Sequence, residues 1–306
     1  MNSTQFMSCL LAQQATLGES LLWDSQRQCW WWTDIEASAI YRWRESYVAP
    51  TMYSTPDRVG SFVLCQSGKI LLGMTKSLAL FDINTRQIEP LVQIEIDLPS
   101  TRVNDGRTDR VGNYVFGSID QSPKREGIGH FYQYSMQHGL RQVDLPAVAI
   151  ANSICFSLDG KTMYFCDTVS QRILQCDYDA ASANVSNIRL FVETEKHAYP
   201  DGSVIDEQGC LWNAQWGASR VVQYAADGRV LQIVKLPAKN PTCPAFGSAE
   251  LNQLVLTSSR KDMTATELLQ MPEAGGLFGL RLSDVRGVTD TLFNDVAHNP
   301  LNDLDD

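Results

Sequence analysis

Short apolar runs separated by polar turns recur along the whole chain, whereas apolar positions at helical spacing are scarce. A typical unit is ICFSLDGKTMYFC, in which two apolar runs flank a polar turn, and a third run, RILQCDYD, follows shortly after. Short apolar runs with Asp, Gly and Asn between them are typical of antiparallel strands and their hairpin turns. The pattern therefore predicts an all-β protein built from repeated hairpins.

Six such units can be aligned by their first turn, and these turns fall near residues 25, 67, 111, 159, 208 and 249. Their spacing of roughly 40 to 50 residues is the length of a four-stranded propeller blade. The spacing predicts a six-bladed β-propeller, formed as one domain by residues 1–306, in which the first strand of each blade lines a central channel. A two-sheet sandwich is the main competing fold, because short alternating strands alone do not exclude it.

The two ends of the chain and the tryptophan run fit the same fold. The segment FMSCLLAQ is expected to add the outer strand to the last blade and close the ring, and NDLDD is expected to be a frayed acidic tail. In CWWWTDI, three consecutive tryptophans must point to both faces of a strand, which predicts core packing between blades.

Composition limits the partners and the compartment. The formal net charge is −10, and an acidic surface disfavours nucleic acid and anionic membranes, so a small-molecule or cationic partner is expected. No pair of the eight cysteines has CxxC spacing, which favours buried, reduced thiols. The N-terminus is a poor signal peptide, and no stretch approaches the roughly 20 apolar residues of a membrane span. These features predict a cytoplasmic protein.

The stretch YPDGSVIDEQGCLW holds two turn signals close together. Asp206 to Gly209 lies between two apolar runs and predicts an ordinary hairpin. Pro200-Asp201-Gly202 is expected to precede the first strand of its blade, with Pro200 and Gly202 directing Asp201 into the channel. At the matching places the other blades carry oxygen-bearing side chains, namely Glu19, Asn104 and Asn152.

Carboxylate and amide oxygens that converge in this way suit a hard divalent cation. Without a cation, Glu19 and Asp201 brought close together would repel, and one would tend to protonate. The pattern predicts one divalent metal ion in the channel, with Ca²⁺, Mg²⁺, Mn²⁺, Zn²⁺ and Fe²⁺ all open as its identity. The competing interpretation is that these are ordinary turn residues, since Asp, Asn and Gly populate loops.

The chain resembles the senescence marker protein, gluconolactonase and regucalcin-like family. The resemblance rests on LGESLLWD, RVNDGRTDRVGNYVFGS, ANSICFSLDGKTMYFCDT, YPDGSVIDEQGCLWNAQWGASRVVQY and GGLFGLRL, and it covers almost the whole chain. It implies a six-bladed propeller with one divalent metal in the channel and an activity that hydrolyses sugar lactones.

Carried over position by position, the resemblance implies the roles of individual residues. Glu19, Asn152 and Asp201 match the metal ligands, and Arg102 and Asn104 match positions that contact the substrate. Asp105 is either a carboxylate behind the metal ligands or a turn-forming residue before Gly106.

The sequence also departs from the family pattern. Arg107 stands where a lysine is common, and the segment after Gly117, SIDQSPKREGIG, lacks the glutamate that some members place there for the sugar. The sequence therefore leaves open which sugar lactone is the substrate, and whether the loop of residues 118–129 contacts it.

These residues suit hydrolysis of a cyclic ester to the corresponding aldonic acid. A channel metal would polarise the carbonyl, Asp201 would take the proton from the attacking water, and Arg102 would stabilise the developing oxyanion. The sequence has no GxSxG, HExxH, Walker or GxGxxG pattern. A propeller that binds calcium or a protein partner without catalysis is the alternative function.

Overall fold

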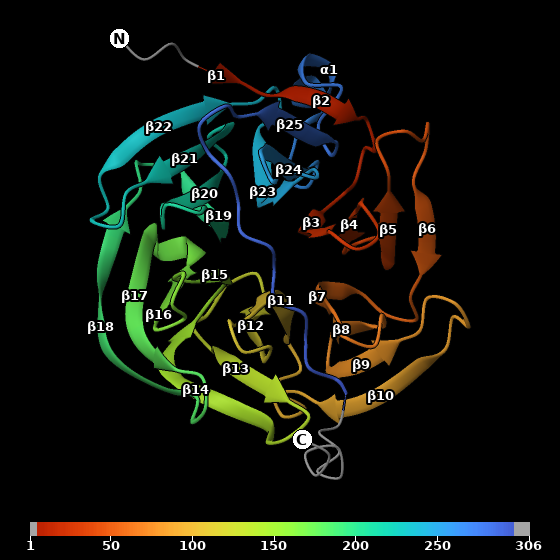
Figure 1. Ribbon diagram of the computed structural model, residues 1–306. Coiled ribbons are helices and arrows are strands. Elements are labelled where there is room, and N and C mark those ends of the chain that lie inside the picture. Colours follow the sequence, from red (N-terminus) through yellow and green to blue (C-terminus); the bar gives the residue numbers. More distant parts are fainter. Residues whose placement is uncertain (1–4, 297–306) are drawn as a thin grey trace, which may run out of the picture.

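The computed structural model describes residues 5–296, which form six sheets arranged as blades around a central channel (Figure 1). The innermost strands begin at one end of this channel, called here the site end, and run toward the other, the turn end. They are β3 (Gly18–Asp24), β7 (Val59–Leu64), β11 (Thr101–Thr108), β15 (Ala151–Phe156), β19 (Tyr199–Ile205) and β23 (Asn240–Gly247).

Each blade continues outward through three more strands. The second strands are β4 (Cys29–Asp34), β8 (Ile70–Met74), β12 (Tyr114–Asp120), β16 (Thr162–Asp167), β20 (Leu211–Trp216) and β24 (Gln253–Ser259). The third strands are β5 (Ala39–Trp43), β9 (Ser77–Phe81), β13 (Gly129–Ser135), β17 (Arg172–Asp179), β21 (Arg220–Tyr224) and β25 (Leu277–Arg281). The outer strands are β6 (Thr51–Ser54), β10 (Ile88–Gln93), β14 (Gly139–Val148), β18 (Asn184–Glu193), β22 (Val230–Lys235) and, in the sixth blade, β2 (Ser8–Leu11).

The six-bladed propeller confirms the predicted fold and excludes the sandwich. Strand β2 pairs antiparallel with β25, so the N-terminal segment closes the ring as expected. A shorter strand that the sequence analysis missed, β1 (Gln5–Phe6), pairs parallel with β22 and adds a fifth strand to the fifth blade. The expected acidic tail, NDLDD, lies outside the described residues.

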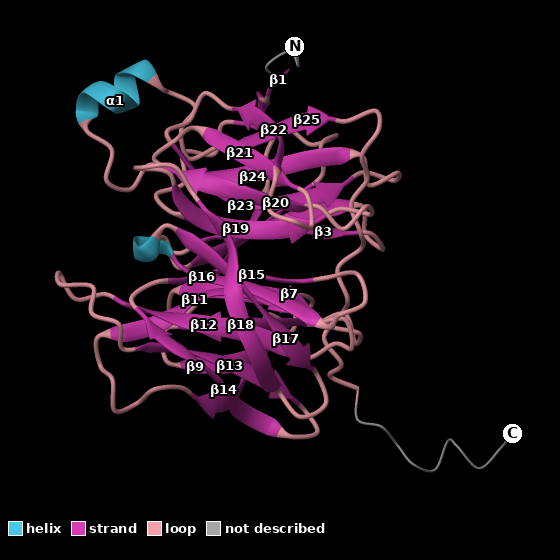
Figure 2. Cartoon of the chain, turned by 90° about the vertical axis from the view of Figure 1, so that its left-hand side faces the viewer, coloured by secondary structure: helices cyan, strands magenta, loops and turns pink. Residues whose placement is uncertain are grey.

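Two short helices stand on the site end of the ring. The 3₁₀ helix η1 (Thr168–Ser170) follows β16, and α1 (Ala265–Gln270) follows β24; Figure 2 shows both on the same side. Among the described residues, no helix is long and apolar enough to cross a bilayer.

The segment of residues 282–296, called here the strap, crosses the turn end of the channel and is the dark-blue chain across the centre of Figure 1. Its backbone bonds to the inner turns of several blades: Glu207 N donates to Arg286 O at 2.8 Å, Gly287 N to Leu251 O at 2.7 Å, and Phe293 N to Leu64 O at 2.8 Å. The strap therefore ties together one end of the channel.

The apolar core lies between neighbouring blades. Trp30, Trp31 and Trp32 are all fully buried, as predicted. Trp30 and Trp32 pack toward the sixth blade, whereas Trp31 packs toward the second. A strand alternates its side chains between two faces, and in a propeller both faces meet another blade. All eight cysteines are free thiols, and seven of them are buried.

Replacing Trp31 by Ala is expected to destabilise the fold by about 3–5 kcal/mol, because it leaves a large cavity between the first two blades. Its ring stacks on Tyr53 at 5.7 Å, and the Arg42 guanidinium lies over it at 5.6 Å. Chemical denaturation would measure the change. Tyr47→Ala is the control, since this ring is 57% exposed and its loss should change stability by less than about 0.5 kcal/mol. Equal midpoints for the two variants would contradict the prediction.

Candidate active site

A β-bulge interrupts the inner strand of every blade near its start. In four blades it falls at the predicted residues, where the register shifts between residues 19 and 22, 103 and 106, 152 and 155, and 200 and 203. A bulge turns side chains away from the regular alternation of a strand. Ser20 and Ser153, next to Glu19 and Asn152, have φ angles of 52° and 60°, which non-glycine residues seldom adopt. The bulges thus lie at the predicted residues or directly after them, and they break the regular alternation of side chains at this end of the inner strands.

The segment Pro200-Asp201-Gly202 lies inside β19, so the prediction that it precedes the strand is wrong. The ladder runs through Pro200, which pairs with Gln215, and the bulge follows it. Gly202 is required by packing: a Cβ there would lie 2.9 Å from the Thr242 carbonyl oxygen of the next blade. Proline and glycine here shape a bulge within a strand and do not form a turn.

Arg102, Asn104 and Asn152 form a hydrogen-bonded row across the third and fourth blades. Arg102 Nη1 donates to Asn104 Oδ1 at 2.8 Å, and Asn104 Nδ2 donates to Asn152 Oδ1 at 3.2 Å. Asn152 Nδ2 donates to Thr168 Oγ1 at 2.9 Å, which orients the amide and its oxygen. All three side chains of the row are buried.

Three carboxyl groups face one another beside this row. Burial raises the pKa of Glu19 to about 8, with a further contribution from Asp105, while Arg102 opposes the rise. Burial and the charges of Glu19 and Asp105 raise the pKa of Asp201 well above its usual range. Burial also raises the pKa of Asp105. The structure therefore brings the predicted residues of four blades into one polar cluster.

The backbone of Asp201 is held firmly, whereas one of its carboxylate oxygens has no partner. Ser153 Oγ donates to the Asp201 carbonyl oxygen at 2.6 Å, and Asn213 Nδ2 donates to the same oxygen at 3.1 Å. Asp201 Oδ1 is buried, and no group in residues 5–296 donates a hydrogen bond to it. Buried polar atoms normally have a partner, so this oxygen is poised to bind a group from outside the protein.

Asn213 and Ser153 are positioning residues that the sequence analysis missed. A signal was present for Asn213, which is a polar residue in the otherwise apolar second strand LWNAQW.

Asp105 lies inside β11 and not in a turn, so its interpretation as a turn-forming residue is wrong. Its Oδ2 accepts a hydrogen bond from the Ile154 backbone at 2.8 Å, which joins the third blade to the fourth. Arg107, the departure from the family lysine, points elsewhere. Its Nη1 pairs with Asp290 of the strap at 2.8 Å. Burial lowers the pKa of the guanidinium, but the Asp290 carboxylate opposes this effect and the pKa lies above its usual range.

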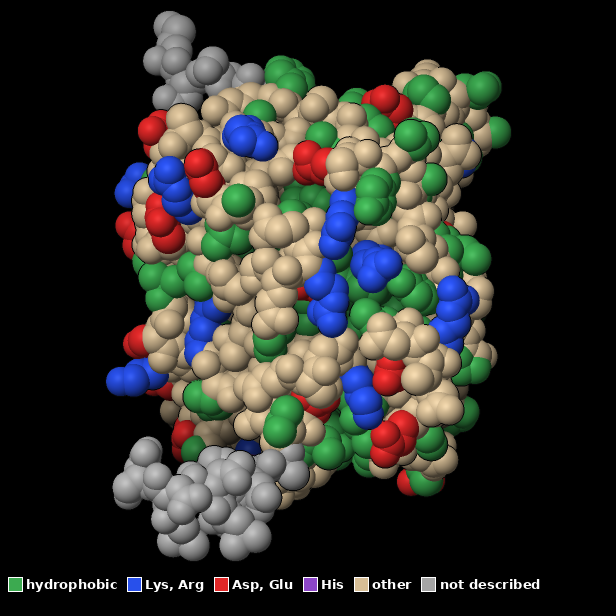
Figure 3. All heavy atoms as spheres, turned by 45° about the vertical axis from the view of Figure 1, so that its right-hand side comes forward, with side chains coloured by type: hydrophobic (Ala, Val, Ile, Leu, Met, Phe, Trp, Pro, Cys, Tyr) green, Lys and Arg blue, Asp and Glu red, His purple; other side chains and the backbone are tan. Residues whose placement is uncertain are grey.

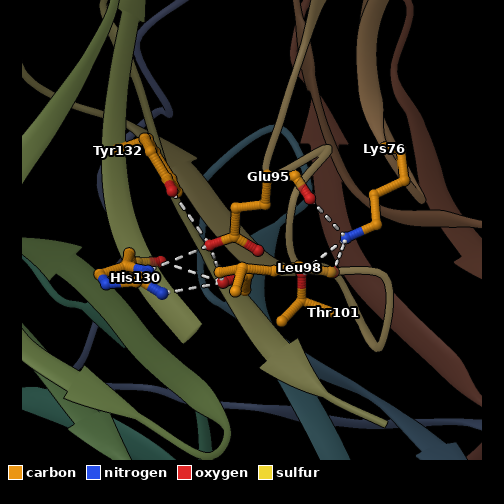
Figure 4. A network of polar contacts seen from close by, with 7 residues as sticks. Lys76, Glu95, Leu98, Thr101, His130 and Tyr132 are labelled. Atoms are coloured by element: carbon orange, nitrogen blue, oxygen red, sulfur yellow. Dashed lines mark hydrogen bonds and ion pairs between the residues drawn. The ribbon is translucent and has the colours of Figure 1, made fainter. Parts of the chain in front are cut away.

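A second polar network supports the strand that carries Arg102 (Figure 4). Lys76 Nζ donates to the carbonyl oxygens of Glu95 and Leu98 and to Thr101 Oγ1, at 3.1, 2.6 and 2.6 Å. The side chain of Glu95 accepts hydrogen bonds from Ser118 and Tyr132, at 2.7 and 3.0 Å. The network fixes the loop that leads into β11. No periodic pattern in the sequence indicates this network, because its members come from four separate segments: Lys76, residues 95–101, Ser118 and Tyr132.

The structure does not itself show a metal centre. In residues 5–296 no group of three or more His, Cys, Asp or Glu side chains is placed to hold a metal ion. The set predicted from the sequence contains only two such residues, Glu19 and Asp201, and its third member is an amide.

The fold and the channel cluster together define a six-bladed β-propeller with a polar site at one end of its channel. The sequence profile described as "SMP-30/Gluconolactonase/LRE-like region" matches residues 17–260, and the chain belongs to this family. The predicted family is thereby confirmed.

Several characterised proteins are similar over most of their length. L-arabinolactonase of Azospirillum brasilense is 39% identical over 267 residues, which cover 86% of this chain and 87% of that protein. The 6-deoxy-6-sulfogluconolactonase of Pseudomonas putida is 30% identical over 295 residues, which cover 96% of this chain and 99% of that protein. The crystal structure of a calcium-binding protein, regucalcin, from Agrobacterium tumefaciens superposes with a TM-score of 0.89 at 29% identity, covering 96% of this chain and 100% of that one.

Proposed function

We propose that this protein hydrolyses a sugar lactone to the corresponding aldonic acid with the help of one divalent metal ion. The observation that carries the proposal is the buried Asp201 Oδ1, which has no hydrogen-bond partner in the described chain and lies in a cluster with Glu19, Asp105 and Arg102. Relatives named L-arabinolactonase and 6-deoxy-6-sulfogluconolactonase support the class of reaction.

Glu19, Asn152 and Asp201 fit a divalent cation. Their donor atoms are oxygens, as Ca²⁺, Mg²⁺ and Mn²⁺ prefer, and three protein ligands leave positions for water and substrate. Burial, followed by repulsion between the carboxylates, raises the pKa values of Glu19 and Asp201, and a cation would remove this repulsion. A similar structure described as a calcium-binding protein supports a divalent ion without identifying it.

Asp201 is the proposed general base. When bound, the cation would supply Lewis acidity at the lactone carbonyl. Asp201 takes a proton from the attacking water as the water oxygen bonds to the carbonyl carbon. The ring C–O bond then breaks, and Asp201 returns the proton to the leaving ring oxygen. The hydrogen bonds from Ser153 and Asn213 to its carbonyl oxygen hold the backbone of Asp201 in place during both transfers.

Arg102 and Asn104 are proposed to bind the substrate. Arg102 is 4% exposed and uses Nη1 for its contacts with Val103 O and Asn104 Oδ1. Its remaining N–H groups are available to a lactone oxygen or hydroxyl, where a fixed guanidinium stabilises developing negative charge. Asn104 is held between Arg102 and Asn152, which sets the direction of its amide. Asp105, behind them, is proposed to tune the charge of the cluster.

The alternative function is a propeller that binds calcium without catalysis, which the name of the similar regucalcin structure favours. A site that only binds a cation has no evident use for the Arg102–Asn104 pair, so the enzyme is the better-supported hypothesis.

The first test is hydrolysis of arabinono-, xylono-, galactono- and gluconolactone, followed with a pH indicator. Chelator-treated protein should show only the background rate, and one added divalent metal should restore activity, because the cation is needed to polarise the carbonyl. Background rates with every lactone and metal, together with tight cation binding by calorimetry, would instead support the calcium-binding propeller.

A further inference from the structure

Cationic side chains collect at the site end although the chain as a whole carries a net charge of −10. On the face that Figure 3 shows, Lys and Arg side chains are interspersed with acidic and apolar ones. At the site end, four cationic residues from three blades stand near one another: Arg58, Arg102, Arg125 and Lys261.

Arg58 is brought next to Arg102 by close packing of two inner strands. It immediately precedes β7, and two residues later Gly60 lies directly against the third blade. A Cβ on Gly60 would lie 2.0 Å from the Val103 carbonyl oxygen, so only glycine permits this approach. Val103 follows Arg102 in β11, so Arg58, just before β7, and Arg102 lie near the starts of two adjoining strands.

Arg125 turns inward from an otherwise exposed loop. The side chains of its neighbours Lys124 and Glu126 are 82% and 58% exposed and pair with each other at 3.7 Å. Arg125 is instead half-buried and donates from Nη1 to the Asp120 carbonyl oxygen, at the end of β12. Asp120 pairs with Thr101, the residue before Arg102. This loop is the segment that departs from the family pattern.

Glu36 is a carboxylate that Lys261 and Arg58 share. It pairs with Lys261 and lies 3.7 Å from Arg58. Within residues 5–296, Arg125 has no carboxylate within ion-pairing distance. Burial, followed by repulsion from Arg58, lowers the pKa of Arg102 to about 10, and Arg125 adds to this effect. Within the described residues, Arg125 is thus a cation of this group that no carboxylate pairs with, and its one side-chain hydrogen bond goes to a backbone carbonyl.

We infer that Arg58 and Arg125 bind an anionic substituent of the substrate, so that the preferred lactone carries a carboxylate, sulfonate or phosphate in addition to its ring ester. The inference rests on the proposed lactonase function and names its substrate class. Guanidinium groups suit such anions because they donate paired hydrogen bonds and stay charged. With Arg102 at the lactone carbonyl, Arg58 and Arg125 would hold the other end of the sugar.

A matched pair of substrates tests the inference. Glucono-1,4-lactone ends in CH₂OH, whereas glucaro-1,4-lactone carries a carboxylate at the same carbon. The kcat/KM for glucaro-1,4-lactone should be higher by about tenfold and should fall as salt screens the arginines. Arg58→Gln and Arg125→Gln should each cost about 3- to 10-fold more with glucaro-1,4-lactone than with glucono-1,4-lactone. Arg229→Gln removes the same charge from a 67% exposed side chain at the turn end and should affect neither substrate.

The outcomes separate this inference from the proposed function. Hydrolysis of both lactones without a preference, and with equal losses in the arginine variants, would overturn the inference and leave the lactonase intact. Hydrolysis of neither lactone, with any metal, would overturn both. Competition by glucarate but not by gluconate, lost in Arg125→Gln, would support the inference independently of turnover.

Discussion

Replacing Asp201 by Asn is expected to lower kcat for lactone hydrolysis by about 10²- to 10⁴-fold, the range typical of removing a general base. The amide keeps the shape of the side chain and can still offer an oxygen to a cation, but it cannot accept the proton of the attacking water. The backbone contacts from Ser153 and Asn213 involve the Asp201 carbonyl oxygen and are retained. The variant should therefore fold normally and lose the chemical step.

The measurement is kcat with saturating metal on the best lactone of the panel, with a thermal melt to verify folding. Asp227→Asn is the matched control, because this carboxylate is 68% exposed at the turn end of the fifth blade. Near-normal, metal-dependent turnover by Asp201→Asn would show that another group activates the water.

Metal-free protein is expected to lose stability as the pH rises from about 4.5 to about 8, because of Glu19. The folded-state pKa of this side chain is raised from 4.5 to about 8 by burial and by Asp105. Between these values the folded state holds a proton that the unfolded state has released, so raising the pH favours unfolding. The raised pKa of Asp201 acts in the same direction.

Glu19→Gln tests this prediction, since the amide cannot ionise. One pKa unit corresponds to about 1.4 kcal/mol, and about 1 kcal/mol to 2–4 °C in Tm for a domain near this size. In the presence of chelator, the variant should melt several degrees above wild type at pH 8 and by much less at pH 5. With saturating metal the order should reverse, because wild type gains the free energy of cation binding.

Glu89→Gln is the control, since Glu89 is 66% exposed on the second blade and pairs weakly with Lys69. A difference between Glu19→Gln and wild type that stays constant from pH 5 to pH 8 would contradict the assigned pKa.

The repeat of hairpins could be predicted from the sequence because each blade contains its own turn residues. Asp159-Gly160 and the matching turns of the other blades are local signals, and local signals survive in a single sequence. Strand β1 was not predicted, because its parallel partner, β22, lies more than 220 residues away along the chain and because a strand of two residues shows no periodicity.

The candidate site was predicted only as a set of matching positions. That Glu19, Asn152 and Asp201 occur at equivalent places follows from the repeat, and the roles assigned to them come from the family resemblance. The bulges at or directly after these residues were not predicted, because a bulge is defined by the register of the neighbouring strand. For the same reason Pro200-Asp201-Gly202 was mistaken for a turn before the strand.

By itself, therefore, the sequence determined the number of blades, the hairpin turns, the family and the residue types available for chemistry, because these depend on local pattern and spacing. Tertiary structure alone decided which charges face one another. The raised pKa values of Glu19 and Asp201 require burial and proximity across blades one, three and five. The cationic group formed by Arg58, Arg102 and Arg125 likewise depends on the close approach of Gly60 to Val103. The reason is that electrostatic energy depends on the distance between charges in space and not on their separation along the chain.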